Sequence, residues 1–302
     1  MQTSSKIILC CGLAIICFSR VPAQDCATQI VPPVLSEAAR ASMEEKRTAA
    51  KAAYELAPNS ADALIWYGRR TAYLGHYTEA IELYTHGMTQ HPNDARLYRH
   101  RGHRYLSIRC VDKALADFKQ AYALTRGKPD EVEPDGMPNA KGIPTSTLQS
   151  NIRYHLGLCL YLKGQYKEAA RYYKEDLRKS ANPDMYVASA NWLYLCYRRL
   201  GLDQKAQKLL ESIEPDMALI ENFDYLKILL LHKNGLNATK LKEEIAQPNS
   251  LSNTTLALGL ANYYYLNGQK EEAERLFKLI TSGNQWASFA FITAEVELGR
   301  TK

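Results

Sequence analysis

Apolar residues recur along most of this 302-residue chain with the spacing of amphipathic helices. Within residues 61–94, and again within 95–128, they fall three or four positions apart on either side of a turn. That turn follows Gly75 in the first segment and lies around Arg109 in the second. A period near 3.6 residues predicts helices rather than strands. Each segment is therefore expected to form two helices joined by a turn, and the same pattern further along predicts an all-α protein.

The two segments also match each other residue by residue. With a period of 34 residues, small residues fall opposite small ones and bulky residues opposite bulky ones: Gly68 with Gly102, Ala80 with Ala114, Tyr84 with Phe118 and Leu64 with Tyr98. Pro92 ends the second helix of the first segment, because proline cannot continue a helix. This combination resembles the tetratricopeptide repeat family, in which small residues lie where the two helices of a hairpin cross and aromatic rings fill the gaps.

The resemblance continues towards the C-terminus through glycines placed at turns. Intervals of 37, 34, 33 and 31 residues separate Gly164, Gly201, Gly235, Gly268 and Gly299. The hairpin around Gly235 lacks the alanine and aromatic positions and is placed by spacing alone. Residues 44–63 read as the second helix of a preceding hairpin, and residues 286–299 as a closing helix that packs on the last hairpin. Such an array implies a right-handed superhelical solenoid of antiparallel helix hairpins, because stacked neighbours bury each other's apolar faces.

The N-terminus has the pattern of an export signal. Lys6 precedes an apolar run from Ile7 to Phe18 that is short for a membrane span, and Val21 and Ala23 occupy the small-residue cleavage positions. We expect cleavage near Ala23 and a periplasmic or secreted protein. The alternatives are an uncleaved anchor and a lipid-modified Cys26. Since no later apolar run is as long as a span, no stable membrane insertion of the mature chain is expected.

These features divide the chain into five segments. They are a signal peptide (1–23), an N-terminal linker (24–40), N-terminal hairpins (41–125), an insertion (126–148), and C-terminal hairpins with the closing helix (149–302).

Charge and cysteine content narrow the classes of function. The formal charge of +6 falls to +4 without Lys6 and Arg20, which argues against a nucleic-acid partner. The four cysteines outside the signal show no CxxC spacing, so no zinc site is expected. Disulfides between Cys26 and Cys110 or between Cys159 and Cys196 stay open. Apolar packing is the expected role of the last two, because they occupy equivalent repeat positions.

Residues 95–109 carry five arginines and two histidines with no acidic residue. In the tetratricopeptide resemblance, the first helix of each hairpin lines the concave groove. The groove residues that the resemblance implies are Arg69, Tyr73, Arg96, Arg99, His103, Asn151, Tyr154 and Asn191.

This basic segment has four candidate explanations: a nucleic-acid footprint, a metal site using His100 and His103, a solvated helix face without a ligand, and a groove for acidic ligands. The last is favoured, because Arg96, Arg99 and His103 are expected to project together. With Arg69 on the neighbouring helix they would form charge-assisted hydrogen bonds with a carboxylate or acidic peptide. By position it resembles the carboxylate clamp of some tetratricopeptide repeats, although this chain has arginine and histidine where that clamp has lysine and asparagine.

The insertion interrupts the helical period. Four prolines and three glycines within Arg126 to Thr147 exclude a helix, and its front half is acidic, with Asp130, Glu131, Glu133 and Asp135. One hypothesis is that this loop lies against Arg96 and Arg99 as a tethered mimic of the ligand. The alternative is a solvated insertion.

No motif of a catalytic site occurs in the sequence, and we expect no enzyme activity, no cofactor and no metal. The predicted function is a protein-interaction scaffold or adaptor that binds a peptide or protein, which would include an acidic segment, in the concave groove. The alternatives are a structural, self-associating solenoid with an idle groove and an envelope hydrolase with a repeat body.

Overall fold

The computed structural model describes residues 26–27, 29–235, 238–245 and 250–301, so the predicted signal peptide (1–23) lies outside the described residues. Within these ranges the chain forms fourteen α-helices, which confirms the all-α prediction. None of these helices has the length and apolarity needed to cross a bilayer. In chain order they are α1 (Glu37–Leu56), α2 (Ala61–Tyr73), α3 (Tyr77–Gln90), α4 (Ala95–Ser107), α5 (Val111–Thr125), α6 (Leu148–Leu162), α7 (Tyr166–Lys179), α8 (Pro183–Arg199), α9 (Asp203–Glu211), α10 (Phe223–Asn234), α11 (Ala238–Glu244), α12 (Leu251–Leu266), α13 (Lys270–Thr281) and α14 (Phe289–Thr301).

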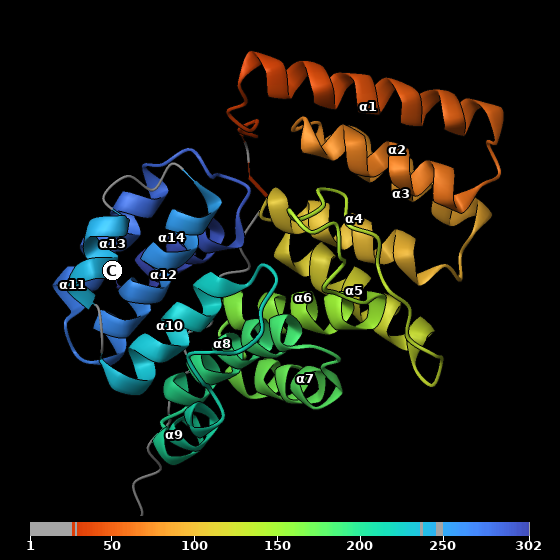
Figure 1. Cartoon of the computed structure of the whole chain (residues 1–302). Helices are drawn as coiled ribbons and strands as arrows, with labels where there is room; N and C mark the ends of the chain where they lie inside the picture. The colour runs from red at the N-terminus through yellow and green to blue at the C-terminus, as the bar shows by residue number, and fades with distance from the viewer. Residues whose placement is uncertain (1–25, 28, 236–237, 246–249, 302) are drawn as a thin grey trace, which may run out of the picture.

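From α2 to α9, and again at α12 and α13, neighbouring helices pair into hairpins that stack in sequence order, and α10 packs between α8 and α12 (Figure 1). The helices of a hairpin approach most closely at the aligned glycines. A Cβ atom on Gly68 would lie 2.6 Å from the ring of Tyr84, and one on Gly157 would lie 2.6 Å from Tyr173. A side chain at either glycine would force the helices apart, since protein interiors are close-packed. The small and aromatic positions read from the sequence are therefore the crossing points of the hairpins.

The last helix, α14, packs on α13, as expected for the closing helix, and it also reaches back to earlier hairpins. The buried carboxylate of Glu297 lies 2.9 Å from Arg199 at the end of α8. Arg300 donates hydrogen bonds to the carbonyl oxygens of Tyr161 and Leu162 at the end of α6, at 3.1 and 2.7 Å. The solenoid thus curls far enough for its last helix to contact the ends of first helices from the middle of the array.

Arg109 makes the corresponding contact from the N-terminal half. It adopts a left-handed backbone conformation (φ 65°), and the equivalent turns have glycine there. A side chain in this conformation costs on the order of 1 kcal/mol. Its guanidinium carbon lies 3.7 Å from the centre of the Trp286 ring, and its Nε lies 2.9 Å from the Glu295 carboxylate. The arginine therefore occupies a glycine position because its side chain joins the turn between α4 and α5 to the C-terminal end of the solenoid.

The segment before α1, predicted as a linker, is attached to the body. A disulfide joins Cys26 to Cys110, which decides one of the pairings left open by the sequence. Beside it, the backbone N–H of Ala27 donates to the carbonyl oxygen of Ile108 at 2.8 Å. Cys159 and Cys196 are free and fully buried, in agreement with the apolar packing role predicted for them.

Replacing Cys26 by serine is expected to lower the free energy of unfolding by about 2–4 kcal/mol, because the disulfide restricts a long loop of the unfolded chain. The loop is long because 84 positions separate the two cysteines. Thermal melting with and without reductant measures the effect. Reductant should lower the melting temperature of the parent protein and leave that of the Cys26→Ser variant unchanged. An equal response of both proteins to reductant would contradict the prediction.

Candidate functional site

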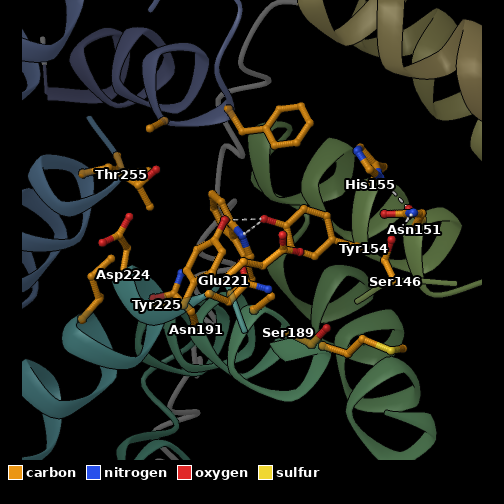
Figure 2. A pocket seen from close by; sticks show the side chains of 18 of the residues that line it. Ser146, Asn151, Tyr154, His155, Ser189, Asn191, Glu221, Asp224, Tyr225 and Thr255 are labelled. Carbon is orange, nitrogen blue, oxygen red and sulfur yellow. Dashed lines mark hydrogen bonds between the residues drawn. The ribbon is translucent and has the colours of Figure 1, made fainter. Parts of the chain in front are cut away.

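The inner wall of the solenoid encloses a pocket of about 580 Å³ (Figure 2). Its lining comes from α4, α6 and α8, the first helices of their hairpins, and from α10 and α12. Further lining residues are Asp176 of α7, Glu221 and Asn222 of the connector before α10, Phe289 and Ala290 at the start of α14, and Thr145 and Ser146 of the insertion. The volume falls within the range of ligand pockets in proteins, roughly 300–1,000 Å³.

The structure brings most of the predicted groove residues to this pocket. Five of the eight line it: Arg99, His103, Asn151, Tyr154 and Asn191. Arg69, Tyr73 and Arg96 are absent from its lining. The helical spacing of the repeats therefore identified the inner wall, but the arginines expected to act together are separated.

The insertion covers Arg69 and Tyr73. At Gly136 the insertion lies so close that a Cβ atom there would be 1.7 Å from the Tyr73 hydroxyl oxygen and 2.8 Å from Arg69 Nη2. Arg70 donates a hydrogen bond to the carbonyl oxygen of Gly136 at 2.7 Å. Since only a glycine fits, the backbone of the insertion itself forms the surface above these two side chains.

Arg99 is paired inside the protein. Its Nε lies 2.9 Å from the carboxylate of Glu133 in the insertion, and both side chains are buried. Nδ2 of Asn151 donates a hydrogen bond to the same Glu133 carboxylate at 3.1 Å. The expectation of a solvated insertion is therefore wrong at this point, because a loop carboxylate has replaced water as the partner of Arg99.

Arg96 does not meet the insertion, and this part of the tethered-mimic hypothesis is wrong. Its guanidinium pairs with Asp94, at 2.6 Å, and with Asp62 of the preceding repeat, which are on its own side of the array. Arg101 pairs with Asp117 of α5 at 2.7 Å. The basic segment of the sequence is consequently divided among several local ion pairs and forms no single open basic surface.

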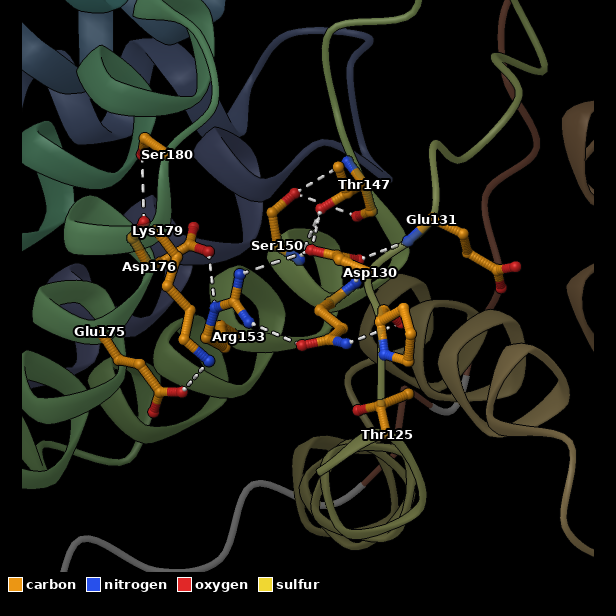
Figure 3. A network of polar contacts seen from close by, with 12 residues as sticks. Thr125, Asp130, Glu131, Thr147, Ser150, Arg153, Glu175, Asp176, Lys179 and Ser180 are labelled. Carbon is orange, nitrogen blue, oxygen red and sulfur yellow. Dashed lines mark hydrogen bonds and ion pairs between the residues drawn. The ribbon is translucent and has the colours of Figure 1, made fainter. Parts of the chain in front are cut away.

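The front of the insertion is anchored by a polar network (Figure 3). Asp130 accepts hydrogen bonds from the Thr147 hydroxyl, at 2.8 Å, and from the backbone N–H of Gln149, at 3.0 Å. A carboxylate there is favourable, because the first N–H groups of a helix lack partners within it. Asp130 thus stabilises the start of α6.

Aromatic side chains form one wall of the pocket. Trp192 donates from Nε1 to the hydroxyl oxygen of Tyr154 at 2.7 Å, and that hydroxyl lies 2.7 Å from the Tyr225 hydroxyl (Figure 2). Trp192 is only 1% exposed, so it supports the wall from behind. Tyr154 and Tyr225 are half-buried and face the pocket.

The histidines of the pocket are neutral. Burial, reinforced by nearby arginines, lowers the pKa of His103 well below its ordinary value and that of His155 to about 3. Because Nδ1 of His155 lies 2.5 Å from the carbonyl oxygen of Asn151, Nδ1 carries the hydrogen and Nε2 carries a lone pair. Neither ring supplies a positive charge at neutral pH.

Two carboxylates at the pocket, Glu221 and Asp224, were missed by the sequence analysis. Glu221 lies in the irregular connector between α9 and α10, and Asp224 lies in the first turn of α10, so no repeat spacing indicates where their side chains point. The buried carboxylate of Asp184 holds this connector by accepting from the backbone N–H groups of Glu221, at 2.9 Å, and Asn222, at 2.8 Å. The position of Glu221 is therefore set by a side chain remote in the sequence.

Among the residues that the structure describes, no cluster of three or more histidine, cysteine or acidic side chains is arranged to hold a metal ion.

Comparison with known proteins identifies one repeat directly. Residues 153–184, in α6 and α7, match the model of the tetratricopeptide repeat family. A search of curated proteins finds no match.

Two similar solved structures are both repeat proteins. One is YrrB, described as a tetratricopeptide repeat protein with an unusual peptide-binding site; it has 14% identity, the match covers 83% of this chain and 98% of YrrB, and the TM-score is 0.45. The other is a tetratricopeptide repeat protein of Parabacteroides merdae, with 16% identity, 84% and 93% coverage and a TM-score of 0.48.

Proposed function

We propose that this chain is a non-enzymatic binding protein that holds a segment of a partner protein in the pocket of Figure 2. The observation that carries the proposal is the pocket itself, a cavity of about 580 Å³ on the inner wall of a helical repeat array. Half-buried aromatic rings and side-chain amides line it, a combination suited to peptide side chains and backbone.

The rigidity of the pocket supports the proposal. Asp184 holds the connector that carries Glu221, and the paired hydroxyls of Tyr154 and Tyr225 join α6 to α10. A pocket whose walls are already ordered loses little conformational entropy when a ligand binds.

The proposal places the protein outside the cytoplasm. Residues 1–23 carry the pattern of an export signal, and the Cys26–Cys110 disulfide is compatible with an oxidising compartment. An adaptor there would bind an exposed segment of another envelope or secreted protein.

Selection of random twelve-residue peptides on the purified chain, followed by calorimetric titration, tests this function. Ala188 lines the pocket from α8, so an Ala188→Trp substitution fills it. We expect selected peptides to bind the Ala188→Trp variant at least about tenfold more weakly than the parent, because an indole occupies the ligand's space.

The matched control is Ala52→Trp, which adds the same side chain at an exposed position on α1. It should bind the peptides like the parent. Peptides that bind the Ala188→Trp variant as tightly as the parent, or the absence of any selected peptide, would exclude the pocket as a peptide site.

A further inference from the structure

The charges at the pocket are unevenly balanced. The pocket-lining Arg99 is neutralised by Glu133 at 2.9 Å, and the pocket-lining Asp176 by Arg153 at 2.8 Å. Glu221 and Asp224 make no ion pair within the described ranges of the chain, although the Glu221 carboxylate accepts hydrogen bonds from the Thr145 hydroxyl and, at 3.1 Å, from Nδ2 of Asn139. The charges left for a ligand are therefore both negative.

Many hydrogen-bond donors of the lining are already used within the protein. The polar side chains concerned donate to backbone oxygens or to carboxylates: Asn151 to Glu133, Ser189 to Asp176, Asn222 to the carbonyl oxygen of Asp184, Thr255 to that of Leu251, and Asn262 to that of Leu258.

Acceptors, in contrast, are left over. The side-chain oxygen Oδ1 of Asn191, a residue 5% exposed, is buried without a hydrogen-bond partner in the described part of the structure. The same holds for Nε2 of His155, which carries a lone pair because Nδ1 carries the hydrogen. An unsatisfied buried acceptor is unfavourable, so a ligand that donates a hydrogen bond to it is stabilised.

The acceptors come from elements that meet at the pocket. Asn191 precedes Trp192 on α8, Asp224 precedes Tyr225 on α10, and the tryptophan and both tyrosines of Figure 2 are joined by hydrogen bonds. Glu221 is exposed, whereas Asn191 is buried. A group that enters the pocket therefore passes a negative charge first and reaches an uncharged hydrogen-bond acceptor deeper inside.

We propose that the ligand enters this pocket with a basic side chain, a lysine or arginine of the partner segment, whose cation lies between Glu221 and Asp224 and whose N–H groups reach Asn191. This inference rests on the function proposed above and specifies the chemistry of its ligand. Tyr154 and Tyr225 contact the aliphatic stem and the cation, which aromatic faces attract. The preference is opposite in sign to the acidic ligand that the arginine-rich segment predicts.

Three peptide pools that differ only at the central position provide the test. The pools are random twelve-residue peptides with a fixed central lysine, norleucine or glutamate, and binding is measured by fluorescence anisotropy. Norleucine keeps the length of the lysine stem without its charge. We expect the lysine pool to bind about tenfold or more tightly than the other two, in keeping with a charge-assisted hydrogen bond.

In a Glu221→Gln/Asp224→Asn variant this preference should shrink to about twofold or less. Asp224 makes no hydrogen bond or ion pair to another described residue, so Asp224→Asn alone keeps the fold and should already weaken the lysine pool. The control is Asp216→Asn, which removes an exposed carboxylate from the same connector away from the pocket lining. It should retain the full preference.

Any of the following outcomes would overturn the inference that the ligand carries a basic side chain. Binding that Ala188→Trp abolishes but that shows no preference for lysine contradicts the basic anchor and leaves the peptide-binding function standing. A preference for glutamate would restore the acidic ligand predicted from the sequence. If no pool binds in a manner that Ala188→Trp weakens, the proposed function fails as well.

Discussion

Replacing Asp176 by asparagine is expected to lower the free energy of unfolding by about 3–5 kcal/mol. Asp176 and Arg153 have side chains only 3% and 1% exposed, and Oδ1 of the aspartate lies 2.8 Å from Nε of the arginine (Figure 3). Ser189 donates to the same carboxylate at 2.6 Å. Asparagine keeps the shape and removes the charge, so the buried guanidinium of Arg153 is left with only the more distant, partly exposed carboxylate of Asp130, at 4.0 Å. Urea unfolding measures the change.

The ion pair between Lys179 and Glu175 supplies a matched control. It lies on the same helix, α7, but the lysine side chain is 45% exposed. Lys179→Ala should therefore change the free energy of unfolding by no more than about 1 kcal/mol. A double variant, Arg153→Met/Asp176→Leu, should recover much of the loss, because apolar replacement removes both buried charges. Equal losses for Asp176→Asn and Lys179→Ala would refute the account.

Replacing Glu297 by alanine should lower the free energy of unfolding by a similar amount, about 3–5 kcal/mol, and open the solenoid. The fully buried Glu297 carboxylate has two cationic partners, Arg199 at 2.9 Å and Arg300 at 2.8 Å. Without it, both guanidinium groups would lack a counterion, and α14 would lose its ion pair with α8. Urea unfolding gives the stability, and small-angle X-ray scattering should show a larger radius of gyration.

The control is Glu272, which also has two cationic partners, Lys242 and Arg275, but both of these are more than half exposed. Glu272→Ala should cost less than about 1 kcal/mol and leave the radius of gyration unchanged. A Glu297→Ala variant with the parent's dimensions and stability would mean that the contact of α14 with α8 does not hold the C-terminal end of the solenoid against its middle.

The candidate site could be predicted in part. The side chains of Asn151, Tyr154 and Asn191 reach the pocket because each lies on the inner side of the first helix of a hairpin. The helical spacing of residues in the sequence predicts which residues lie on that side. Glu221 and Asp224 could not be predicted, because Glu221 lies in the irregular connector before α10 and Asp224 in the first turn of α10, and the path of the connector depends on Asp184. A repeat alignment carries no information about such a segment.

The charge of the site was beyond prediction for a related reason. Arg99 was expected to attract an acidic ligand, but Glu133 lies against it at 2.9 Å. An arginine side chain is long and can pair with any carboxylate that the fold brings near. Whether its charge remains available to a ligand therefore depends on its neighbours in the tertiary structure. The sequence placed acidic residues in the insertion without showing which of them would reach an arginine.

The sequence by itself determined the helices, the hairpins and their crossing glycines, because the helical period and the fit of Gly68 against Tyr84 act over short distances. Only the tertiary structure decided how far the solenoid curls. That curvature is the sum of small rotations between successive repeats, and no single repeat records it. Arg109 illustrates both parts: its place in the turn follows from the period, whereas its contacts with Trp286 and Glu295 exist only because the C-terminal end curls back onto the α4–α5 hairpin.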